Sequence, residues 1–246
     1  MQFTNLRKLA NQTVTWWIVF LISSLLFLVS CGDSQEPTEK KSQSPGQESF
    51  TFFDLSNMTP LTERVREDLR SKLGRDAIAR RNILDLEINY KGFIKEYLPE
   101  LDALNQKLNF PPRERVDHNT VKLMYRYAQK KNVPFDYVEL VFSDYTDTPV
   151  LFQINFKVDE SAIVDTLREK YGKPEVIAWS EKNGESMFWK KNGDFLIVSL
   201  MPNQFGKHDY QIVIYYTENL EQLIETERKE KEAKEQQEAK KRKAAF

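Results

Sequence analysis

The sequence predicts an α+β fold, in which N-terminal helices are followed by a β-hairpin, one helix, an antiparallel β-meander and a charged C-terminal helix. Three observations lead to this prediction. Between residues 59 and 131, apolar side chains recur about every 3.6 residues, as on one face of a helix. After Pro134 they alternate with polar residues, as in a half-buried strand. After Ile224 they almost disappear while Glu, Lys and Gln continue, which favours a solvated helix.

The region 50–134 is predicted to be helical, and its clearest helix lies at its start. Thr59 is expected as the N-cap, because its hydroxyl can accept a hydrogen bond from a free backbone N–H of the first turn. Pro60 suits the first helical position, and Gly74 suits the end. Between them one apolar residue recurs every four positions: Leu61, Val65, Leu69 and Leu73.

Two further helical stretches are expected in this region. The first runs from Leu86 to Leu108 and is interrupted at Pro99, which kinks a helix or starts a new one. The second spans Asn119–Lys131 and is closed by Pro134. Its proposed buried face consists of Val121, Met124, Tyr125 and Ala128.

The region 135–217 is predicted to be an α+β layer. Alternating apolar residues over 138–142 and 152–158 indicate a hairpin with one buried face. Asp159 and Glu160 then open a short helix, which Gly172 closes. A meander follows, and its expected strands are Val176–Trp179, Ser186–Lys190, Phe195–Leu200 and Tyr210–Tyr216.

The segment 218–246 is predicted to be an exposed, charged helix. Four acid-before-base pairs at helical spacing support it, each by a few tenths of a kcal/mol. These pairs are Glu225 with Lys229, Glu227 with Lys231, Glu230 with Lys234, and Glu238 with Arg242. The basic run 240–243 suggests either contact with anionic lipid or another envelope polymer, or a solubilising tail, and the tail is favoured.

Residues 1–30 have the composition of a secretory signal peptide. Arg7 and Lys8 form a positive start, and an apolar run extends from Val14 to Val29. This run is shorter than the roughly 20 apolar residues that a membrane-spanning helix needs. Cleavage is therefore the preferred expectation, and an uncleaved transmembrane anchor is the alternative.

A short motif at the end of the run resembles the lipobox of bacterial lipoproteins: Leu28, Val29, Ser30 and Cys31. The resemblance implies cleavage after Ser30 and acylation of Cys31, which makes the lipid bilayer a partner through that residue. Three acyl chains would hold the protein stably, whereas one anchors only marginally. Gly32 at the next position implies a place on the periplasmic side of the outer membrane rather than the inner one.

The stretch after the cysteine is predicted to be a disordered tether over residues 31–49. From Gly32 onward it contains no apolar side chain, so it cannot bury enough surface to offset the entropy of ordering. A flexible coil of this length has an end-to-end distance on the order of 25 Å. Since Cys31 is the only cysteine, the mature chain has no internal disulfide, and its stability must come from a hydrophobic core.

A second resemblance concerns the folded part. The helix ending at Tyr171–Pro174, followed by a strand ending in Trp179 and a meander, is similar to small α+β domains of SmpA/OmlA-like envelope lipoproteins. That resemblance implies a role in outer-membrane assembly. The group places two helices before three strands, however, whereas here a strand pair precedes a single helix, and no site residue is carried over.

Few residues suggest chemistry, and no catalytic, cofactor-binding or metal-binding residue is predicted. The chain has two histidines and lacks serine-hydrolase, P-loop and dinucleotide-binding motifs. Its near-neutral charge argues against nucleic acid as a partner. His118 beside Asp117 could form an acid–base pair of an unfamiliar envelope hydrolase, but a helix start explains both residues more simply. His208 is expected in a turn.

Three aromatic residues of the meander, Trp179, Phe188 and Trp189, could line a ligand groove, although core packing is favoured. The sequence therefore predicts a membrane-anchored envelope lipoprotein that binds a protein partner or assists assembly, rather than an enzyme.

Overall fold

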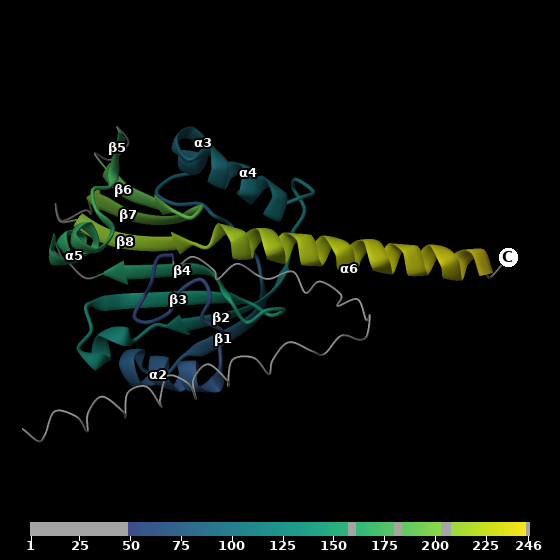
Figure 1. The fold of residues 1–246 in the computed structure, drawn as a ribbon, viewed down its shortest axis with the longest axis horizontal. Coiled ribbons are helices and arrows are strands. Elements are labelled where there is room, and N and C mark those ends of the chain that lie inside the picture. Colours follow the sequence, from purple (N-terminus) through teal and green to yellow (C-terminus); the bar gives the residue numbers. More distant parts are fainter. Residues whose placement is uncertain (1–48, 157–160, 180–183, 203–207, 245–246) are drawn as a thin grey trace, which may run out of the picture. The chain divides into compact units, whose positions relative to one another are not determined.

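The computed structural model describes residues 49–156, 161–179, 184–202 and 208–244. The expected signal peptide, the motif Leu28, Val29, Ser30 and Cys31, and the tether up to residue 48 lie outside the described residues. Among the helices of the described ranges, none is both long enough and apolar enough to cross a membrane. Helices packed around one antiparallel sheet confirm the α+β fold class (Figure 1).

One eight-stranded sheet forms the centre of the fold, and every neighbouring pair in it is antiparallel. The predicted hairpin, helix and meander are confirmed. Strands β4 and β8 pair directly, so the meander joins the hairpin within one sheet. In spatial order the strands are β1 Ala77–Asn82, β2 His118–Tyr125, β3 Phe135–Ser143, β4 Pro149–Phe156, β8 His208–Tyr215, β7 Asp194–Pro202, β6 Gly184–Lys191 and β5 Glu175–Trp179.

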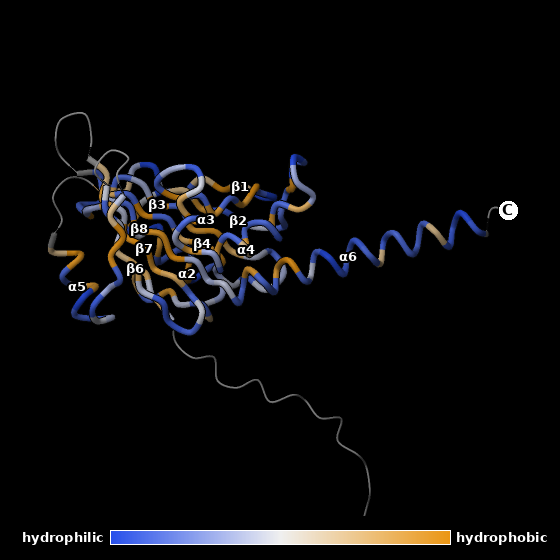
Figure 2. Tube along the Cα trace, turned by 90° about the horizontal axis from the view of Figure 1, so that it is seen from above, coloured by the Kyte–Doolittle hydropathy of each residue, from blue (hydrophilic) through white to orange (hydrophobic). Residues whose placement is uncertain are grey.

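Helices cover both faces of this sheet. They are α2 Glu63–Leu73, α3 Phe93–Tyr97, α4 Pro99–Leu108, α5 Ser161–Tyr171 and α6 Thr217–Ala244, with a short 3-10 helix at Ala128–Lys131. Side chains alternate between the two faces along each strand. Leu140 and Phe152 therefore lie in a core with α2 and α5, whereas Val141 and Val213 lie in a second core with α3, α4 and the start of α6. The expectation that the β3–β4 hairpin buries one face is therefore wrong, because the sheet is a middle layer. Figure 2 shows hydrophobic residues concentrated in the sheet, whereas most of α6 is hydrophilic.

The largest correction concerns the helix expected over Asn119–Lys131. Residues 118–125 form strand β2, and only Ala128–Lys131 is helical, as a 3-10 turn. β2 lies between β1 and β3, so its backbone hydrogen bonds come from segments distant in sequence. The region 50–134 is therefore not purely helical, and its strands β1 and β2 belong to the same sheet as the strands of 135–217.

The first two predicted helices exist, but their starts differ. The hydroxyl of Thr62 caps α2 by accepting from the Val65 N–H at 3.2 Å, whereas Thr59 bonds to Ser56 in the preceding turn. The helix ends at Gly74 as predicted. Residues 84–88 belong to neither a helix nor a strand, and the helix expected from Leu86 starts at Phe93. Pro99 begins α4, so of its two expected effects, kinking a helix or starting a new one, the second is observed.

Candidate functional site

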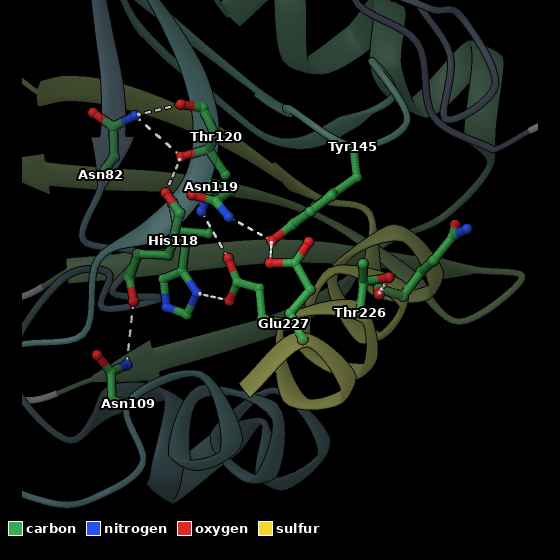
Figure 3. A network of polar contacts seen from close by, with 11 residues as sticks. Asn82, Asn109, His118, Asn119, Thr120, Tyr145, Thr226 and Glu227 are labelled. Atoms are coloured by element: carbon green, nitrogen blue, oxygen red, sulfur yellow. Dashed lines mark hydrogen bonds and ion pairs between the residues drawn. The ribbon is translucent and has the colours of Figure 1, made fainter. Parts of the chain in front are cut away.

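A network of polar contacts joins the start of β2 to helix α6 (Figure 3). The Nδ1 of His118 lies 2.8 Å from Oε2 of Glu227, and the Asn119 backbone N–H donates to Oε1 of the same carboxylate over 2.7 Å. The side chain of His118 is 2% exposed and that of Glu227 is 21% exposed. We call this group the His118–Glu227 joint.

The joint corrects the expected pairing of His118 with Asp117. The Asp117 carboxylate pairs with Nε of Arg115 at 3.1 Å, and Glu227, 109 residues along the chain, orients the imidazole. His118 begins a buried strand rather than a helix, and its Nε2 is buried without a hydrogen-bond partner among the described residues. Since the imidazole is enclosed, its geometry suits holding α6 in place and not reaching a substrate.

A second contact extends the joint by one turn of α6. The Tyr145 hydroxyl donates to Oε2 of Glu230 over 2.9 Å and accepts from Nδ2 of Asn119 (Figure 3). Burial, together with the Glu230 carboxylate, raises the pKa of Tyr145, so this hydroxyl keeps its proton at neutral pH. The joint thus fixes two carboxylates on consecutive turns of the helix.

The base of α6 is held in the same manner. Asp194 Oδ1 accepts from the backbone N–H of Thr217 at 2.8 Å, which places a carboxylate at the positive end of the helix dipole. The buried Asn219 amide donates to the carbonyls of Asn57 and Pro149 at 2.8 and 2.7 Å. Leu220 and Leu223 enter the core below. The first turns of α6 are therefore part of the fold.

The spacing of three residues in α6 is a sequence signal for the joint. Leu220, Leu223 and Glu227 are spaced by three and four residues, so they lie on one face of a helix. Glu227 therefore points where the two leucines point, toward the sheet. Its expected pairing with Lys231, and that of Glu230 with Lys234, are replaced by these contacts. The pairs Glu225 with Lys229 and Glu238 with Arg242 form at 3.2 and 3.6 Å.

A groove of about 800 Å³ lies between α4 and α6. Its apolar lining includes Ile224 and Phe110, a residue that is 69% exposed. Charged side chains border it, and one of these, Arg228, already pairs with Glu225 and Glu232. The groove lies next to the part of α6 that leaves the fold.

The three meander aromatics do not lie on one face of the sheet. Trp179 packs in the core with α3 and α4, whereas Trp189 packs in the core on the opposite face. Phe188 packs against the same core as Trp179. Core packing therefore accounts for the buried parts of all three. The backbone of His208, expected in a turn, begins β8.

Across the described ranges, no group of three or more His, Cys, Asp or Glu side chains is placed to hold a metal ion. No protein-family model, curated protein or solved structure matches the chain. The candidate site therefore has to be interpreted from its own geometry. That geometry is a fixed helix base, an adjoining groove and an exposed helical segment.

Proposed function

We propose that the protein is a lipid-anchored envelope lipoprotein that uses α6 to bind a protein partner. The single observation that carries this proposal is the exposure of α6. Every residue from Arg228 to Lys243 is exposed, and over this length the helix rises about 24 Å at 1.5 Å per residue. Figure 1 shows α6 continuing beyond the ends of the strands.

The fixed base makes this exposed helix a suitable binding element. Most of the stability of a helix in a protein comes from its packing against the rest of the fold rather than from helix propensity. Three sets of contacts fix the orientation of the first turns of α6: the Asp194 cap, the Asn219 amide and the His118–Glu227 joint. A partner would then meet an ordered helix and would not have to order a flexible tail, which lowers the entropic cost of binding.

Charge indicates the kind of partner. Residues 228–243 contain eight basic and four acidic side chains, and the last four are all basic. Basic residues near a helix C-terminus also stabilise the helix itself through its dipole. The excess of positive charge nevertheless favours an acidic protein surface, and the groove beside Ile224 offers that surface an apolar contact.

The anchor rests on the lipobox resemblance of Leu28, Val29, Ser30 and Cys31. With acylated Cys31 in the membrane, preferentially the outer membrane, the folded region would face the periplasm. The tether would let α6 search for its partner within a limited distance of the membrane.

Site-specific crosslinking in intact cells tests the binding role. A photoreactive residue at the exposed Lys234 should give a discrete protein adduct, while one at the exposed Lys95 of α3 should not. Replacing residues 240–243 with glutamate should abolish the Lys234 adduct, because the charge complementarity is reversed. Adducts to lipid alone, or a protein adduct that survives the charge reversal, would contradict the proposal.

Metabolic labelling tests the anchor. An alkyne fatty acid should label the wild-type protein, and Cys31→Ser should lose both the label and the mobility shift of cleavage. An uncleaved transmembrane anchor predicts the opposite, namely that the variant keeps its size and its membrane attachment.

A further inference from the structure

A second hollow lies beside the edge strand β5. Its volume is about 340 Å³, which is within the range of small-molecule sites. Its aromatic lining is Phe50, Tyr171, Phe188 and Trp189, and charged side chains surround this lining. We call it the basic hollow.

The aromatic wall of the basic hollow is held in place by hydrogen bonds. The indole N–H of Trp189 donates to the Gly172 carbonyl over 2.8 Å, and its side chain is almost fully buried. The Tyr171 hydroxyl accepts from the Thr51 backbone N–H at 3.1 Å. The ring of Phe50 meets that of Tyr171 edge to face, with centroids 5.0 Å apart. The wall therefore exists before any ligand binds.

The charges around this wall are mostly positive. Lys173 and Lys191 are exposed and form no ion pair within the described ranges. Lys170 Nζ donates to the Thr51 hydroxyl at 2.6 Å, which keeps its charge near the wall without neutralising it. Lys190 also contributes to the lining, but its ammonium pairs with Glu100. Glu175 is the one acidic residue of the lining, so two positive charges remain in excess.

We propose that the basic hollow binds a phosphate monoester. Such a group carries about −1.5 to −2 charge at pH 7, which matches the excess of two positive charges, whereas a single carboxylate would neutralise only half of it. Lysine ammonium groups bind phosphate as point charges and tolerate several orientations. The carbon part of the ester would lie against Tyr171, the half-buried ring that lines the hollow on the same face of the sheet as Trp189.

This site is independent of the binding role of α6, and it does not require the lipid anchor. The phosphate could belong to a soluble ester or to a lipid headgroup, since both present the same chemistry to the lysines. The two sources differ only in whether acyl chains follow the phosphate.

Calorimetric titration of the full-length chain in a neutral detergent tests the proposal. Glycerol 3-phosphate should bind, and glycerol should not. The double variant Lys173→Ala with Lys191→Ala should weaken glycerol 3-phosphate binding by about tenfold or more, because it removes two charge-assisted contacts. The matched control, Lys240→Ala with Lys241→Ala on α6, should bind as the wild type does.

Soluble dihexanoyl phosphatidic acid distinguishes the two sources. Binding tighter than that of glycerol 3-phosphate would assign the hollow to a lipid headgroup, and equal binding would assign it to a soluble ester. The proposal is overturned if neither phosphate compound binds, if the double variant at Lys173 and Lys191 binds as the wild type does, or if succinate binds as tightly as the phosphate.

Discussion

At the scale of single residues, Asp76 links α2 to the segment that enters β1. Its side chain is 2% exposed, and its carboxylate accepts from Nε of Arg66 at 2.7 Å and Nε of Arg70 at 3.0 Å. Burial alone would raise the pKa of Asp76, but the hydrogen bonds from the two arginines outweigh burial and lower the pKa below its ordinary value of 3.8. The ionised carboxylate therefore stabilises the fold.

Asp76→Asn should lower the free energy of unfolding by about 1–3 kcal/mol at pH 7, because it leaves two partly buried guanidinium groups without their anion. The pKa is depressed on folding, so this stabilisation is complete well above pH 3.8 and is lost as the pH falls through the folded-state pKa. Urea unfolding at pH 7 and near pH 3 measures both effects. The difference between wild type and variant should shrink at low pH, and a constant difference would contradict this account. Asp68→Asn, at an exposed carboxylate of α2, is the control and should change little.

The His118–Glu227 joint gives a second prediction at this scale. Glu227→Gln removes the charged acceptor shared by His118 and the Asn119 N–H, so the start of β2 and the third turn of α6 should separate more often. Hydrogen exchange at the Asn119 amide should accelerate by about tenfold, which corresponds to about 1.4 kcal/mol. Glu225→Gln, at a carboxylate two residues earlier that is 45% exposed, is the matched control. Equal exchange rates in the two variants would argue against the joint.

At the scale of elements, β2 explains which parts of the fold could be predicted from the sequence. Val121 and Tyr125 are buried in either a helix or a strand, because a spacing of four residues fits both periods. The helix and the strand differ in which residue between these two is buried. The predicted helix would bury Met124, whereas a strand buries Leu123. The segment is a strand because it pairs with β1 and β3. The spacing of apolar residues within the segment gives no information about that pairing. The hairpin and meander were predictable because short turns connect their paired strands.

The same two residues provide a direct test of the corrected element. Leu123 is fully buried and Met124 only partly, as the strand requires and the helix does not. Leu123→Ala should lower the free energy of unfolding by about 2–5 kcal/mol, and Met124→Ala by less than about 1 kcal/mol. Chemical denaturation of the two variants measures this difference. The reverse order would favour the helix over Asn119–Lys131.

At the scale of the described fold, the two cores share one sheet. Strands β4 and β8 pair at its centre, and each contributes side chains to both cores, for example Phe152 and Leu151 from β4. A core cannot be lost on one face without disturbing strands that also support the other face. The cores should therefore unfold together, although α2 and α4, which cover them, are separate helices.

Leu69→Ala in α2 and Leu101→Ala in α4 test this coupling, since each removes a fully buried side chain from a different core. Each variant should lower the free energy of unfolding by about 2–5 kcal/mol. Because both act on one cooperative unit, each should shift the same single unfolding transition, with circular dichroism and tryptophan fluorescence giving the same midpoint. Two separate transitions, each shifted by only one of the variants, would instead mean that the shared sheet does not couple its faces. In that case the α6 base, which packs on the Leu101 side, could loosen while the core around Leu69 stays folded.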